Sequence, residues 1–156
     1  MTFQIHGLPR ARFEPLFTLG DAALSAKGVV RMRVSETPGF PCRVGLRDLE
    51  AGESVLLLNH THQPADTPYR SAHAIFVGEQ SADATVQPDQ VPEVLARRIL
   101  SIRAFDAAGM MLDADLSEGE GPTAALIERL LADPRADRLH IHNARRGCFA
   151  AWAARA

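Results

Sequence analysis

The stretch "DRLHIHNARRGCFAAWAARA", Asp137–Ala156, alternates apolar and polar residues before an "ARRG" sequence interrupts the pattern. A period of two is typical of a β-strand, and "ARRG" supplies a turn, so two antiparallel strands are expected here. On the first strand, Leu139 and Ile141 would face the core. His140 and His142 would then lie side by side on the opposite face.

Further elements are expected on either side of this stretch. Residues 97–117 contain two alternating runs joined around "DAAG", which predicts a hairpin, and 122–133 carry an apolar stripe at helical spacing. Asp21 can cap a second helix that follows it. The other expected strands cover residues 2–8, 29–35, 42–48, 54–62 and 73–79.

These elements favour an α+β fold. We predict a mainly antiparallel, twisted sheet with two or three helices packed on it, formed by residues 1–156 as a single domain. Strands and helices alternate too irregularly for a doubly wound sheet, and neither a G-x-G-x-x-G motif nor a P-loop is present.

Two of the expected strands also predict which side chains are buried. In 29–35, apolar residues such as Val30 and Met32 alternate with polar ones, as in a half-buried strand. In 42–48, the same alternation would turn Arg43 away from the apolar face.

Composition excludes several classes of protein. The net charge of −2 argues against a nucleic-acid-binding protein, and no apolar run is long enough to cross a membrane. The first residues lack the pattern of a secretory signal. We therefore expect a cytoplasmic protein whose partner is a small molecule, with neither nucleic acid nor membrane involved.

The histidine pairs raise the question of a metal. His60 and His62 repeat the spacing of His140 and His142, and neutral imidazoles on neighbouring strands can bind a zinc-like ion. The alternative is that polar residues cluster where strands meet solvent. Because no carboxylate lies within either pair, we expect metal binding to be weak or absent, with His62, His140 and His142 as weak candidates.

A polar loop follows the second pair. Asp66, Thr67, Tyr69 and Arg70 lie between prolines that restrict the backbone. Loops on rigid scaffolds often carry binding residues. The alternative is a simple turn in which Asp66 bonds nearby backbone amides and Arg70 is solvated.

The two cysteines are candidates for thiol chemistry. Cys148 follows Arg145 and Arg146, and Cys42 precedes an arginine, so a positive field could activate either thiol. However, each lies in an apolar segment, and cytoplasmic thiols remain reduced. We expect two free thiols that pack in the core, with a reversible bridge as the alternative.

Three motifs in the same order resemble a bacterial family known as domain of unknown function 1203: "GFPCRVGLRD" (39–48), "HQPADTPYRSAHAIFV" (62–77) and "HIHNARRGCFAA" (140–151). The resemblance implies a single-domain cytosolic protein and supplies no reaction. The family pattern falls on Pro41, Cys42, Arg43, His62, Gln63, Pro64, Asp66, Thr67, Pro68, Tyr69, Arg70, His142, Asn143, Ala144, Gly147 and Cys148. Relatives often carry an aromatic residue in place of His60, and Ser-Gly-Pro in place of 72–74.

The function predicted from these residues is binding of a small anionic molecule, because several arginines lie near histidines. Its pocket would be formed by the His62–Arg70 loop and the His140–Cys148 hairpin. Catalytic candidates are His62, Asp66 and His142. Ligand-binding candidates are Arg43, Thr67, Tyr69, Arg70, Asn143 and Arg145. The alternatives are a thiol redox protein using Cys42 and Cys148 and a non-catalytic interaction module; catalysis and any cofactor are left open.

Overall fold

The computed structural model describes residues 1–156 and contains ten strands, four α-helices and one 3-10 helix. The strands are β1 (Phe3–His6), β2 (Val30–Arg33), β3 (Pro41–Cys42), β4 (Arg47–Asp48), β5 (Ser54–Gln63), β6 (Ser71–Gly78), β7 (Ile99–Phe105), β8 (Met111–Glu118), β9 (Arg138–Asn143) and β10 (Phe149–Arg155). The helices are η1 (Arg10–Arg12), α1 (Glu14–Phe17), α2 (Asp21–Ala26), α3 (Glu93–Ala96) and α4 (Glu120–Leu131).

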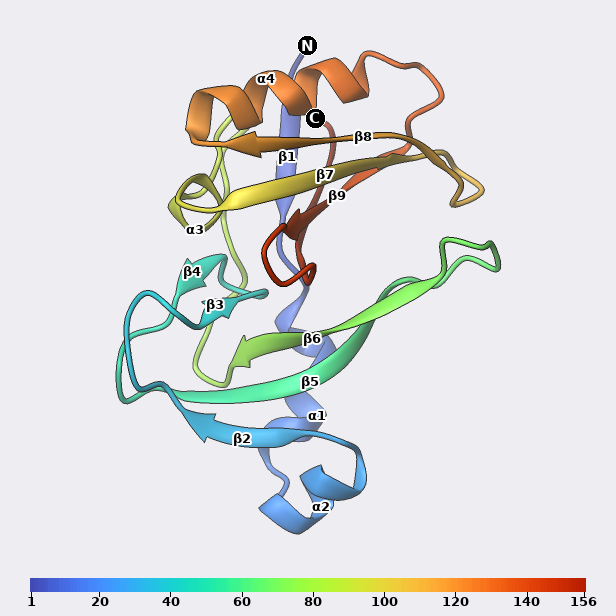
Figure 1. Ribbon diagram of the computed structural model, residues 1–156. Coiled ribbons are helices and arrows are strands. Elements are labelled where there is room, and N and C mark those ends of the chain that lie inside the picture. The colour runs from blue at the N-terminus through green and yellow to red at the C-terminus, as the bar shows by residue number, and fades with distance from the viewer.

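The strands form two five-stranded sheets (Figure 1). The first has the order β1-β10-β9-β7-β8 and the second the order β2-β5-β6-β3-β4. All pairs are antiparallel except β3 with β6. The predicted α+β class with mainly antiparallel strands is therefore confirmed, with the strands divided between two sheets.

Helix α4 covers the outer face of the first sheet, at the top of Figure 1. Its buried stripe, which includes Ile127 and Leu131, packs in one apolar core with Leu139 and Ile141 of β9. Successive side chains of a strand point to opposite faces, so His140 and His142 point away from α4 and towards the second sheet. No helix combines the length and the apolar character that crossing a membrane would require.

A second apolar core belongs to the other sheet. Leu56 and Val77 pack there with Phe13 and Leu24 from the segment containing the first two helices. Phe149 of β10 is buried in this core although its strand belongs to the first sheet. Apolar packing therefore continues from one sheet to the other, which fits a single domain.

Strand β2 differs from the expected half-buried pattern. Val30 is 54% exposed and Met32 is 37% exposed, whereas Val34, just beyond the strand, is buried. The reason is position: β2 is an edge strand that pairs only with β5. An alternating sequence does not show whether a strand lies at an edge or at the centre of a sheet.

The single strand predicted over 42–48 is wrong. The chain forms two short strands, β3 and β4, around a turn in which Leu46 has a left-handed φ of 50°. Arg43 lies in this turn and is only 2% exposed. The prediction that Arg43 faces away from the apolar side is therefore wrong, because strand alternation does not continue through a turn.

Candidate functional site

Five of the six histidines gather where the two sheets face each other. Strand periodicity places His60 and His62 on one face of β5 and His140 and His142 on one face of β9. The fifth is His73 of β6, which is the cross-strand partner of His60. Three strands from two sheets therefore build the cluster.

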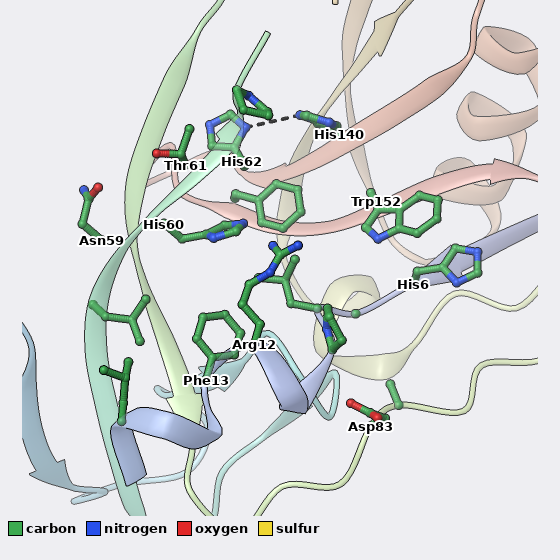
Figure 2. Close-up of a pocket in the computed structure, with 18 of the residues that line it drawn as sticks. His6, Arg12, Phe13, Asn59, His60, Thr61, His62, Asp83, His140 and Trp152 are labelled. Atoms are coloured by element: carbon green, nitrogen blue, oxygen red, sulfur yellow. Dashed lines mark hydrogen bonds between the residues drawn. The ribbon is translucent and has the colours of Figure 1, made fainter. Parts of the chain in front are cut away.

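His62 lies at the centre of this cluster. Its Nδ1 is 3.2 Å from His140 Nδ1 (Figure 2) and its Nε2 is 2.9 Å from His73 Nδ1. The ring also stacks on Phe149, with centroids 5.3 Å apart and planes within 8°. His62 consequently joins the two sheets through both polar and aromatic contacts.

His142 is held differently. Its Nδ1 lies 2.9 Å from the carbonyl oxygen of Gly147, which can only accept, so Nδ1 carries the hydrogen. The side chain is fully buried, and its Nε2 has no hydrogen-bond partner. Three ring nitrogens lie within 4.8 Å of one another, one each from His62, His73 and His142. This is the group of residues that could hold a metal ion.

Burial keeps the histidines neutral. It lowers the pKa of His62 and His142 to about 3 and that of His60 and His140 to about 4. Neighbouring positive charges, including that of Arg103, contribute to these values for His62, His140 and His142. Neutral rings offer lone pairs at physiological pH, which suits metal ligands and hydrogen-bond partners better than proton donors.

A cavity of about 1040 Å³ lies beside the cluster (Figure 2). His60, His62 and His140 line it from the two sheets, and the segment around Phe13 lines it from the N-terminal part of the chain. Trp152 also contributes to the wall. The cavity is therefore bounded by strands of both sheets and by the η1–α1 segment.

The charges around the cavity are mainly positive. Arg12, Lys27 and Arg138 line it, whereas Asp83 is the one carboxylate among its lining residues. Asp83 already accepts a hydrogen bond of 2.6 Å from a backbone amide. The Arg138 guanidinium lies 4.5 Å from the ring centroid of Trp152. The cavity thus combines cations with an aromatic surface.

The predicted polar loop packs elsewhere. Asp66 is exposed, and Thr67 Oγ1 donates to the carbonyl of Gly109 in the β7–β8 turn at 3.2 Å. Arg70 donates to a carbonyl of its own loop, and the exposed Tyr69 ring lies near β7. None of these four side chains lines the cavity.

Arg43 also lies outside the cavity, and its buried side chain connects the sheets. Its Nε donates to Phe149 O at 2.7 Å and its Nη1 to Pro41 O at 2.6 Å. Its Nη2 lies 3.0 Å from Cys148 Sγ. No carboxylate pairs with it, and burial lowers its pKa. The "PCR" motif and the β9–β10 hairpin therefore meet through this guanidinium.

Both cysteines are free thiols. Cys42 is buried, and its Sγ is 3.4 Å from Ser81 Oγ. Asn143 is buried and directs its amide nitrogen towards Cys148 Sγ at 3.7 Å, whereas Arg145 is exposed. The redox role of the two cysteines stays a prediction.

Several residues of this site were not among those predicted from the sequence. His73 could have been found, because pairing the strands on either side of the polar loop sets it opposite His60. Arg12 and Arg138 carried no comparable signal. They line the same cavity only because the fold places η1 and β9 around it, which local sequence patterns do not encode.

Comparisons with known proteins give one family. A family model described as "Protein of unknown function (DUF1203)" matches residues 39–155. The histidine cluster lies within the matched range, whereas Arg12 and Lys27 of the cavity lie before it. No match was found among curated proteins or among solved structures. Since the matched range covers most of the 156 residues, the chain belongs to the DUF1203 family, whose function is unknown.

Proposed function

We propose that the protein binds a small anionic organic molecule in the cavity between the sheets. The observation that carries the proposal is the excess of cations among the lining residues, where Arg12, Lys27 and Arg138 face a single carboxylate, Asp83. Guanidinium groups bind carboxylates and phosphates through paired hydrogen bonds. Such a ligand would supply the negative charge that the cavity lacks.

The rest of the lining indicates an apolar body for the ligand. Phe13, Leu16, Phe149 and Trp152 supply apolar and aromatic surface. Trp152 is itself stacked on His6 at 4.0 Å and lies beneath Arg138. A few polar groups on an apolar wall are typical of small-molecule sites.

The proposed pocket overlaps only partly with the one expected from sequence. His62 and His140 line both. The cations that line the cavity are Arg12, Lys27 and Arg138, whereas the sequence predicted Arg43, Arg70 and Arg145. The neutral histidines would act as hydrogen-bond partners for the ligand, and the proposal includes no reaction. It also includes a cytoplasmic location, supported by the two free thiols.

The experiment compares a charged probe with a neutral molecule of the same shape. Binding of benzoate and of benzamide is measured by calorimetry on metal-free protein. Benzoate should bind more tightly, because only its carboxylate can pair with the guanidiniums. Arg12→Ala should weaken benzoate binding at least about tenfold, the value expected for a lost charged hydrogen bond.

Arg146→Ala is the matched control, since Arg146 is exposed and does not line the cavity. This variant should bind benzoate as the unmodified protein does. Equal binding of benzoate and benzamide, or an equal effect of the Arg12 and Arg146 substitutions, would contradict the proposal.

A further inference from the structure

We propose that His62, His73 and His142 bind a divalent transition-metal ion of the zinc type. The three side chains come from β5, β6 and β9, so the ion would join the two sheets. His62 alone belongs to both this site and the cavity lining. The metal site is nevertheless distinct from the proposed anion-binding cavity, because its three protein ligands include none of the cations that line that cavity.

The most specific observation is the orientation of His142. Its Nδ1–H is engaged by the carbonyl of Gly147, which leaves the lone pair on Nε2. That nitrogen is fully buried and has no hydrogen-bond partner. A histidine whose second nitrogen donates to a backbone carbonyl is the usual form of a zinc ligand. The unpartnered atom therefore has the orientation and protonation of a ligand.

The spacing of the donors also fits. Zinc–nitrogen bonds are about 2.0–2.1 Å long, which places the nitrogens of a tetrahedral site about 3.3 Å apart. The observed separation of His62 Nε2 and His73 Nδ1 is 2.9 Å, and all three donors lie within 4.8 Å of one another. Small rotations of the rings would bring the three nitrogens to ligand distance.

The positive charge around the proposed metal site determines which kind of fourth ligand the ion would bind. Three neutral imidazoles leave the ion with its full charge. Arg103 of β7 is the cross-strand partner of His140 of β9, so it adds a further positive charge on the face of the first sheet that carries His142. Arg103 hydrogen-bonds to Ser101 Oγ at 3.3 Å and pairs with no carboxylate. The fourth ligand should accordingly be an anion from solution, held to the ion with the help of Arg103.

Titration of the chelator-treated, untagged protein with Zn²⁺ tests the site. We expect one equivalent to bind by calorimetry, and Co²⁺ in its place should give the intense visible absorption of a tetrahedral site. His73→Ala should weaken Zn²⁺ binding by on the order of 100-fold or more, because even the loss of an outer hydrogen-bond partner costs 10–100-fold. His73 is only partly buried, so this variant should fold. A thermal unfolding curve followed by circular dichroism checks that the variant is folded.

His6→Ala is the control, because His6 stacks on Trp152 away from the three donors. This variant should bind Zn²⁺ as the unmodified protein does. Absence of stoichiometric binding, or equal affinity of the His73 variant and the unmodified protein, would overturn the proposal.

The anionic fourth ligand has its own measurement. Azide added to the Co²⁺ form should shift the visible bands. Arg103→Ala should raise the azide concentration required by about fivefold while Co²⁺ stoichiometry stays at one. Bands that do not respond to azide would overturn the open anionic position. Because these titrations contain no benzoate, their failure is distinguishable from failure of the proposed function.

Discussion

His60 shows how much the surroundings of one residue change its chemistry. Its ring is buried between Phe13 and Phe149, with centroids 6.3 and 5.8 Å away, and Arg12 lies close enough to lower its pKa further. Together, burial and Arg12 lower the pKa of His60 from 6.5 to about 4. Between pH 6.5 and about 4, His60 is therefore neutral in the folded protein although it is protonated in the unfolded chain.

Acid should destabilise the metal-free protein as a result. Between pH 6.5 and about 4, His60 is protonated in the unfolded chain and neutral in the folded one, so the free energy of unfolding falls as the pH falls. Each such histidine adds a slope of about 1.4 kcal/mol per pH unit. His60→Phe should reduce the slope by about this amount and keep the aromatic packing. Urea unfolding at several pH values, with a chelator present, measures it; an unchanged slope would contradict the assignment.

The sequence predicted some individual residues and not others. The shared face of His140 and His142 follows from strand periodicity alone. Arg43 was expected to point away from the apolar face of a strand. In the structure it is buried and contacts two backbone carbonyls and Cys148 Sγ, which the fold brings together. Its burial without a carboxylate is a property of the tertiary structure.

At the scale of elements, local patterns predicted both hairpins and the long helix but not the turn between β3 and β4. The β7–β8 hairpin, α4 and the β9–β10 hairpin all occur where alternation and helical spacing predict them, because each is formed by residues close in sequence. The contact between the polar loop and the β7–β8 turn could not be predicted. These two turns are far apart in the chain and meet only because each sheet places one of them at the same end of the molecule.

Gly109 is the tightest point of that contact. Its φ is 84°, and a Cβ there would lie 2.4 Å from Ala65 Cβ, so substitution adds a clash to the backbone strain. Gly28 has a similar φ of 71° with no atom within 4 Å of the added Cβ. Gly28→Ala should lower the free energy of unfolding by about 1–2 kcal/mol, the cost of a left-handed backbone conformation for alanine. Gly109→Ala should lower it by clearly more.

Chemical denaturation of the two variants gives the comparison, and hydrogen exchange should show increased opening of residues 64–70 in the Gly109 variant alone. An equal loss in the free energy of unfolding for the two variants would mean that residues 64–70 move aside easily and that the two turns are not rigidly packed.

Across the whole molecule, the site is the meeting of two sheets. Histidines from β5, β6 and β9 and cations from η1 and β9 come together there, although sequence patterns predict each strand separately. The sequence therefore indicated which histidines share a face but not which faces oppose each other. Both the cavity and the proposed metal site depend on that second fact.

Trp152 allows the charge of the cavity to be measured directly. It is the only tryptophan, and it lines the cavity beneath Arg138. A positive potential attracts anions and repels cations, so iodide should quench its fluorescence more effectively than caesium does. Each quenching constant is divided by that of a free tryptophan derivative, at constant and low ionic strength.

We predict that the normalised iodide constant exceeds the caesium constant at least about twofold. Arg12→Ala should reduce this ratio, whereas Arg146→Ala should leave it unchanged. Equal constants for the two ions, or stronger quenching by caesium, would contradict an anion-binding cavity between the sheets.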